Sequence, residues 1–196
     1  MPCKFTIIMK TLDKVLLEIA RLAIYEDLVG KKLIDKQKYI EQFPELAQKQ
    51  AVFVTLNKVD GKRESLRGCI GSILPVRPLI DDVIYNAKAA AFNDPRFPPL
   101  SPDEFDDIKI EISLLSIPQP VSYNNVEELK QIIKPFKHGV ILKLGDRQAT
   151  FLPQVWEQIP GFDLFFEHLC QKAGLPGNCL AYHPEIYIYE VKKIEE

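Results

Sequence analysis

The hexapeptide Leu66-Arg-Gly-Cys-Ile-Gly71 places a thiol, a guanidinium and two glycines within one short segment. In an extended strand, Arg67 and Cys69 point to the same face, roughly 6.6 Å apart along it. A nearby guanidinium favours the thiolate form of a cysteine, which is its nucleophilic form. Gly68 and Gly71 have no side chain, so a ligand or another backbone segment can approach closely. The pattern is typical of a displayed nucleophilic or redox thiol, and equally of a buried cysteine in a tightly packed strand.

A thiol nucleophile requires a base, and His138 is the best placed of the three histidines because it begins a predicted hairpin. Glu111 lies on the less apolar face of a predicted strand, where a carboxylate can orient a histidine or pair with Arg67. Cys69, His138 and Glu111 are therefore the candidate catalytic residues. The alternatives are a surface histidine without a role and a structural ion pair.

Arg96 lies in the proline-rich segment 93–102. A guanidinium on a stiff loop can hold a carboxylate or phosphate through two parallel hydrogen bonds. The alternative is an Asp94–Arg96 turn that braces two segments. Arg96 joins Arg67 and the glycines Gly68 and Gly71 as a candidate binding residue.

We expect no metal site and no cofactor. Zinc-type ligands are present in His168, Cys170, Cys179 and His183. However, residues two apart on a helix are separated by roughly 200°, and the spacing does not match structural zinc motifs. The sequence contains no phosphate-binding loop, dinucleotide fingerprint, serine-hydrolase elbow or zinc-protease motif.

The composition is that of an ordinary globular protein. The chain has 196 residues, 46% hydrophobic and 27% charged, with a net charge of −2. This balance excludes a disordered chain and a general binder of nucleic acid or anionic membranes. No apolar stretch is long enough for a signal peptide or a membrane span, so we expect a cytoplasmic protein. Four cysteines in such a protein are expected as thiols, although Cys170 and Cys179 are close enough in sequence for a bridge.

Helical periodicity and capping residues predict four helices. The first is capped by Thr11 and stops at Gly30, and the second begins at Pro78 with an apolar stripe to Ala91. A capping box of Asn125 and Glu128 begins a short third helix, and residues 164–173 form the fourth. The lysine-rich segment 31–38 is read as a solvated turn.

Alternating and continuous apolar runs predict the strands. Asp60-Gly61 predicts a hairpin between residues 51–56 and 66–73, with Val54 opposite Arg67 and Val52 opposite Cys69. A second hairpin has its turn at Gly145-Asp146. Residues 108–114 and 185–191 form further strands. The fold class is therefore α+β, with largely antiparallel sheets and flanking helices.

The hexapeptide and further blocks resemble the AMMECR domain family. These blocks are Ala90–Leu100, Glu111–Ser116, His138–Leu142, and Ala149–Trp156 continuing into Phe166–Leu175. The resemblance covers residues 10–191 and treats residues 1–9 as an N-terminal extension, with Met9 as an alternative start. It implies one α+β domain with two lobes and a cleft. It implies no established reaction, and it points to Memo-like and radical-SAM proteins as pathway partners.

The sequence does not decide whether the protein is an enzyme. The first hypothesis is an enzyme or enzyme component whose cleft carries Cys69 as thiol nucleophile or ligand contact. The second is a non-catalytic binding module for a partner protein, a peptide or a small anion. The third is an RNA-modification factor, because the family is described in that connection.

Overall fold

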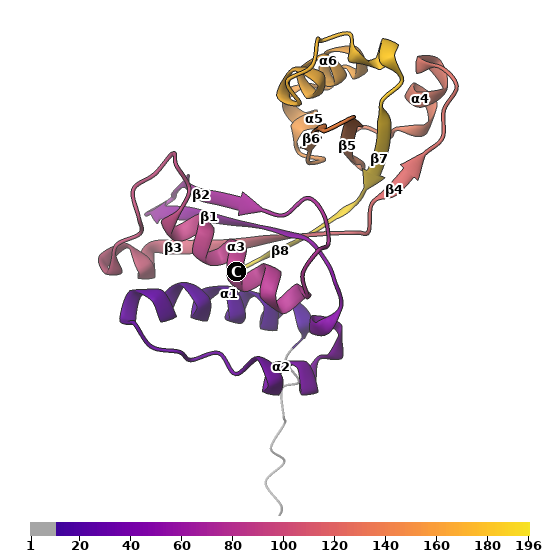
Figure 1. Ribbon diagram of the computed structural model, residues 1–196. Helices are drawn as coiled ribbons and strands as arrows, with labels where there is room; N and C mark the ends of the chain where they lie inside the picture. The colour runs from indigo at the N-terminus through magenta and orange to yellow at the C-terminus, as the bar shows by residue number, and fades with distance from the viewer. Residues whose placement is uncertain (1–10) are drawn as a thin grey trace, which may run out of the picture. The chain divides into compact units, whose positions relative to one another are not determined.

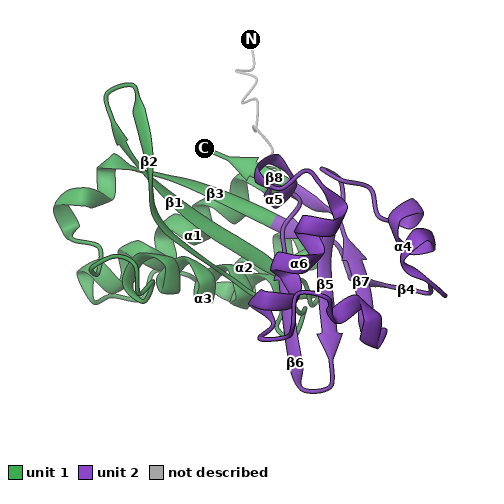
Figure 2. Cartoon of the chain, turned by 90° about the horizontal axis from the view of Figure 1, so that it is seen from above, with its two compact units in different colours: residues 1–113, 193–196 green, residues 114–192 purple. Residues whose placement is uncertain are grey.

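A computed structural model describes residues 11–196, which divide into two compact units (Figure 2). Unit 1 holds the described residues up to Ser113 together with residues 193–196, and unit 2 holds Leu114–Lys192. Each unit is built around a four-stranded sheet. The expected extension of residues 1–9, with Cys3 and Met9, lies outside the described residues.

The helices of unit 1 cover one face of its sheet, as Figure 1 shows for α1 and α3. Helix α1 (Leu12–Val29) begins where the Thr11 hydroxyl accepts the Lys14 N–H and ends at Gly30, whose φ is 66°. The predicted cap and stop are therefore confirmed. Helix α3 (Leu79–Phe92) follows Pro78 as expected.

The lysine-rich segment of unit 1 contains a helix that the sequence did not predict. Helix α2 (Lys36–Gln42) is capped by Asp35, whose side chain accepts the Lys38 N–H. A short 3₁₀ helix, η1 (Pro44–Ala47), follows it, and a second one, η2 (Pro102–Asp107), precedes strand β3. The prediction of a solvated turn over residues 31–38 is wrong from Lys36 onward.

The sheet of unit 1 has the strand order β2-β1-β3-β8, which places β2 at an edge. Its strands are β1 (Val52–Asp60), β2 (Arg63–Gly71), β3 (Ile108–Leu115) and β8 (Val191–Glu195). Alternate residues of β1 and β3 are buried against the helices. These residues are Val52, Val54, Leu56, Ile108, Ile110 and Ile112. The opposite face of the sheet carries the other side chains.

The register of the β1–β2 hairpin differs from the predicted one. Its turn is Gly61-Lys62, so Asp60 lies opposite Arg63, and Gly61 takes the left-handed conformation with φ 61°. A β-bulge then shifts the register, and Cys69 lies opposite Thr55 instead of Val52. The expected pairing was wrong because the turn lies one residue later and the bulge adds one more residue.

Unit 2 has the strand order β4-β7-β5-β6. Its strands are β4 (Gln119–Val121), β5 (Gly139–Leu144), β6 (Arg147–Phe151) and β7 (Glu185–Tyr189). Its helices are α4 (Val126–Ile132), α5 (Val155–Gln158), α6 (Phe162–Lys172) and the 3₁₀ helix η3 (Cys179–Tyr182). The second hairpin is confirmed, with Leu144 opposite Arg147 across Gly145-Asp146. The expected single strand 185–191 is wrong, because β7 and β8 are separate strands of different sheets.

The core of unit 2 is aromatic. The Trp156 ring stacks on Phe165 with centroids 3.5 Å apart, and both side chains are fully buried. The Trp156 indole N–H donates to the backbone carbonyl of His138 at 2.8 Å, so its one polar group is satisfied.

The strand pairing of both units confirms the α+β class. The pairs β1–β2, β4–β7, β5–β6 and β5–β7 are all antiparallel. Among the described residues, no helix combines the length and apolar character needed to cross a membrane.

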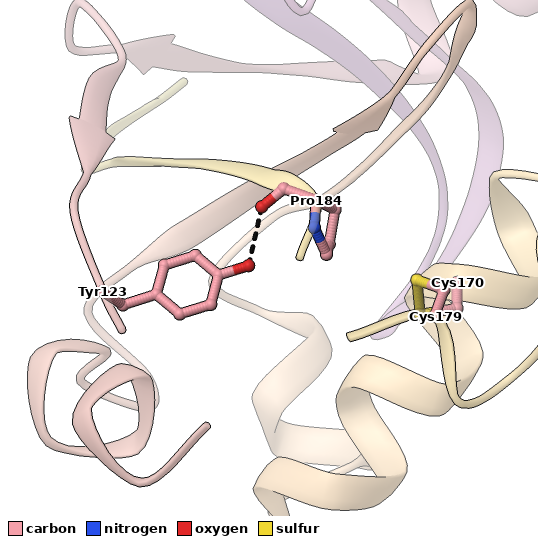
Figure 3. The surroundings of a disulfide bond; sticks show 4 residues. All are labelled: Tyr123, Cys170, Cys179 and Pro184. Atoms are coloured by element: carbon pink, nitrogen blue, oxygen red, sulfur yellow. Dashed lines mark hydrogen bonds between the residues drawn. A yellow bond between two sulfur atoms is a disulfide. The ribbon is translucent and has the colours of Figure 1, made fainter. Parts of the chain in front are cut away.

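A disulfide joins Cys170 at the end of α6 to Cys179 at the start of η3 (Figure 3). The chain reverses direction at Gly174, whose φ is 72°, and this brings the two Cα atoms to 5.8 Å. Both cysteines are fully buried in the core of unit 2. The expectation of four free thiols is therefore wrong for this pair.

Replacing both bridged cysteines with alanine is expected to lower the free energy of unfolding by about 2–3 kcal/mol, since the bridge closes a loop of about ten residues in the unfolded chain. Urea unfolding of wild type and the C170A/C179A variant measures this difference. Alkylation of the unfolded, unreduced protein should label Cys69 but neither Cys170 nor Cys179. Labelling of Cys170 and Cys179 would contradict the bridge.

Candidate functional site

Cys69 lies on the edge strand β2 with its thiol on the sheet face away from α1 and α3. It is free and partly exposed. Thr55, directly opposite on β1, donates its hydroxyl hydrogen to the Cys69 Sγ across 3.3 Å. The side chain is therefore accessible and oriented by a neighbouring strand, which a reactive thiol requires.

The backbone of Cys69 is held at the sheet edge by the loop that follows α3. The Cys69 N–H donates to Asp94 Oδ2 at 2.8 Å, and Arg96 Nη2 donates to the Cys69 carbonyl at 3.3 Å. The Asp94 carboxylate and the Arg96 guanidinium thus act as the acceptor and the donor that the backbone of a neighbouring strand would otherwise provide. This arrangement closes the open edge of β2 at the thiol.

Asp94 and Arg96 form one fixed unit. Arg96 Nε donates to Asp94 Oδ1 at 2.9 Å, and Arg96 Nη2 donates to Oδ2 at 2.6 Å. The hydrogen bonds from Arg96 hold the pKa of the buried Asp94 carboxyl far below its usual range. The same bonds raise the pKa of Arg96, and the thiolate of Cys69 adds to that rise. The Asp94–Arg96 brace, which was the alternative interpretation of this segment, is present, and it holds a permanent positive charge at the Cys69 backbone carbonyl.

Arg96 also retains a surface for a ligand. Its side chain is 52% exposed although Asp94 fixes it. Its remaining terminal nitrogen, Nη1, makes no hydrogen bond to a described residue of unit 1. A guanidinium held in this way can receive an anionic group without losing its bond to Asp94.

Arg67 has a different role from the predicted one. As the bulge residue, it interrupts the alternation that would place it on the face of Cys69. Its side chain is only 8% exposed and bonds Glu104 through Nε at 3.0 Å and Nη2 at 3.1 Å. Hydrogen bonds from Arg67 lower the pKa of Glu104 to about 2. The pair of buried Arg67 and partly buried Glu104 fastens η2 to β2, and the guanidinium that contacts the backbone of Cys69 is that of Arg96.

The two glycines of the hexapeptide are required by packing. A Cβ atom on Gly68 would lie 2.1 Å from the carbonyl oxygen of Ala90 in α3. A Cβ atom on Gly71 would lie 2.2 Å from the ring of Phe53 on β1. Another backbone segment therefore makes the close approach at Gly68, and an aromatic ring makes it at Gly71.

Glu111 forms a cross-strand ion pair. Its carboxylate lies 2.9 Å from Lys193 Nζ of β8, and the neighbouring Lys109 pairs with Glu64 of β2 at 3.1 Å. The anticipated pair between Glu111 and Arg67 is not formed, because each has another partner. Glu111 thus belongs to a row of alternating charges that crosses the sheet.

His138 lies in unit 2 and is buried there. Its Nδ1 accepts the Lys134 N–H at 3.2 Å, and burial lowers the pKa of the imidazole. The neutral imidazole, with Nδ1 as the acceptor, joins the two ends of the turn formed by residues 134–138. Cys69 and Glu111 belong to unit 1 and His138 to unit 2, so the catalytic triad stays a prediction.

Two of the four zinc-type ligands named from the sequence have another partner. Cys170 and Cys179 are bonded to each other and offer no thiolate. Within residues 11–196, no group of three or more His, Cys, Asp or Glu side chains could hold a metal ion.

Sequence reasoning missed the contacts that fix the thiol. Thr55 had no signal of its own, because its role follows from the bulged register. Asp94 was seen as a partner of Arg96, but its bond to the Cys69 N–H was not anticipated. The Asp-Pro-Arg spacing was the available signal for the brace.

Comparisons with known proteins agree with this fold. The sequence model of the AMMECR1 family matches residues 17–194. A protein of Methanothermobacter thermautotrophicus is 40% identical over 179 residues, covering 90% of this chain and 88% of that protein. Protein MJ0810 of Methanocaldococcus jannaschii is 39% identical, covering 90% and 86%. The crystal structure of the uncharacterized protein PH0010 from Pyrococcus horikoshii is similar with a TM-score of 0.79 at 36% identity, covering 93% of this chain and 90% of that one.

The Gly68→Ala variant is expected to lose about 2–3 kcal/mol of stability, because the new methyl group meets the backbone of α3 and not a flexible side chain. Thermal or urea unfolding measures the loss. Gly161→Ala is the matched control, since nothing lies within 4 Å of that added carbon, and it should cost under about 1 kcal/mol. Equal stability of the Gly68→Ala variant and wild type would refute the packing account.

Glu104→Gln is expected to destabilise the protein by roughly 3 kcal/mol at pH 7, because it leaves the buried Arg67 charge unpaired. The folded-state pKa of Glu104 is about 2, against an ordinary 4.5. The ion pair therefore stabilises the fold above pH 4.5, and this stabilisation is lost as the pH falls toward 2.

Urea unfolding of wild type and Glu104→Gln is measured between pH 7 and pH 2. The difference in their free energies of unfolding should shrink as the pH falls below 4.5. The control is Glu64→Gln, which removes an exposed pair with Lys109 and should cost under about 1 kcal/mol. If the difference in free energy of unfolding between wild type and Glu104→Gln does not depend on pH, Arg67 does not stabilise the fold through its ion pair with Glu104.

Proposed function

The chain belongs to the AMMECR1 family, and from that premise we propose that it is an enzyme or enzyme component that uses the Cys69 thiol as a nucleophile or ligand contact. One observation carries the proposal: a free, partly exposed thiol belongs to a residue whose backbone carbonyl accepts a hydrogen bond from a guanidinium that a buried carboxylate fixes in place. A thiolate at Cys69 would be stabilised by this charge without any rearrangement.

The ligand of such a site would carry an anionic or strongly polar group. Arg96 is half-exposed, and Asp94 engages only part of its guanidinium. A carboxylate or phosphate bound to Arg96 would lie close to the residue that carries the thiol. Arg96 would then both bind the ligand and stabilise the thiolate.

A second candidate is a non-catalytic binding module that uses the same face of the sheet. Within the described residues of unit 1, the Cys69 Sγ bonds to the Thr55 hydroxyl and not to an imidazole or carboxylate. A thiol without an adjacent base suits a ligand contact at least as well as a nucleophile. The resemblance adds Memo-like and radical-SAM partners and a connection to RNA modification as proposals of the same standing. A cytoplasmic location, expected from the short apolar stretches of the sequence, is a further proposal.

Alkylation by iodoacetamide tests whether the Cys69 thiol is activated. The thiolate sulfur displaces iodide from carbon, so the rate reports the thiolate population at fixed pH. We expect Cys69 of the folded protein to react at pH 7 and Arg96→Gln to slow the reaction about fivefold. Charges a few ångströms apart in water interact by about 1 kcal/mol, which corresponds to that factor.

Two controls separate charge from folding. Arg96→Lys keeps the positive charge and should slow alkylation less than Arg96→Gln, and the unfolded forms of all variants should react at one common rate. Cys69→Ser should abolish the modified peptide. A Cys69 that stays protected until the protein unfolds, or an equal rate in the Arg96→Gln variant, would reject the activated thiol.

A further inference from the structure

Phe136 is an exposed aromatic residue in a strained conformation. Its φ is 65°, in the left-handed region, and its side chain is 61% exposed. A bulky residue in this region is a conformational outlier, and glycine or asparagine would suit the turn better. Neither the backbone nor the packing of unit 2 accounts for a phenylalanine at this position.

The loop that carries Phe136 is held closed at its base. The His138 N–H donates to the Lys134 carbonyl at 3.0 Å, and the Lys134 N–H donates to His138 Nδ1 at 3.2 Å. Lys137 pairs with Glu190 at 3.0 Å, whereas the Lys134 ammonium forms no ion pair with a described residue of unit 2. The loop therefore presents an apolar ring beside an unpaired positive charge.

A complementary cavity lies in the same unit. It has a volume of about 290 Å³ and lies where β4 and β7 meet the segment before β7. Its apolar lining includes Val121, Pro184 and Ile186, and its rim carries the Glu185 carboxylate, whose side chain is 58% exposed. Since a cavity of roughly 150 Å³ can hold a benzene ring, this one has room for a phenyl side chain.

The loop and the cavity lie at opposite ends of β7. Lys137 of the loop contacts Glu190 just after β7, and Glu185 is the first residue of that strand. Five residues of extended chain separate them by roughly 17 Å. The loop of one molecule therefore does not reach its own cavity, whereas two molecules with antiparallel β7 strands bring each loop to the other's cavity.

We propose that unit 2 carries a self-association surface, in which Phe136 of each molecule fills the β4–β7 cavity of a second copy. Lys134 then meets Glu185 of that copy, where it competes with Lys143, whose Nζ lies at 4.0 Å from the same carboxylate. The contact is two-fold and closed, because the same loop and cavity serve on both sides. The proposal does not depend on the chemistry of Cys69.

Sedimentation velocity of the full chain over a range of concentrations tests this surface. We expect a concentration-dependent dimer whose dissociation constant rises at least about tenfold in Phe136→Ala, as for a central aromatic anchor. Leu164→Ala is the matched control, since Leu164 is also exposed in unit 2 but lies on α6, and it should leave the dimer unchanged.

A charge exchange tests the predicted partner of Lys134. Lys134→Glu and Glu185→Lys should each weaken the dimer, and the double variant should recover much of the lost affinity. A wild-type monomer at all concentrations, open-ended polymers in place of a dimer, or a Phe136→Ala variant that associates like wild type would each overturn the proposal.

Discussion

The Asp94 carboxylate accepts the backbone N–H of Cys69 and two hydrogen bonds from the Arg96 guanidinium, and Arg96 in turn donates to the Cys69 carbonyl. This arrangement forms on an edge strand, where backbone groups would otherwise face water or another chain. It fixes the strand at Cys69, closes the sheet edge there, and keeps a positive charge at the backbone carbonyl of the residue that carries the thiol. Every chemical role considered for Cys69 depends on it.

The remaining residues of the hexapeptide prepare the strand for that contact. Gly68 lets β2 approach the backbone of α3, and Gly71 accommodates the Phe53 ring. Arg67 occupies the bulge and buries its charge against Glu104, which ties η2 to the strand. Packing and thiol display are therefore not competing explanations of this segment. The packing residues determine where the strand lies, and Cys69 is the member of the segment whose polar side chain remains accessible.

Local signals in the sequence predicted local structure well. Thr11 and Gly30 marked the ends of α1, and Gly145-Asp146 marked a hairpin, because caps and tight turns depend on neighbouring residues. The site was predicted only in part, because its geometry depends on distant contacts. The bulge at Arg67 interrupts the alternation of side chains along β2, and the guanidinium bonds Glu104, 37 residues later in the chain. The pairing of Cys170 with Cys179 likewise required the position of η3 against α6.

Amide hydrogen exchange at Cys69 tests the central claim most directly. Its N–H points to a loop side chain and not to the paired strand β1, so its protection reports the Asp94 contact itself. The account predicts that this amide exchanges as slowly as the hydrogen-bonded amides of the β1–β2 ladder in wild type. It predicts much faster exchange in Asp94→Ala, while the ladder amides keep their protection. Fast exchange at Cys69 in wild type, or unchanged protection in the variant, would contradict a thiol held in place by Asp94 and Arg96.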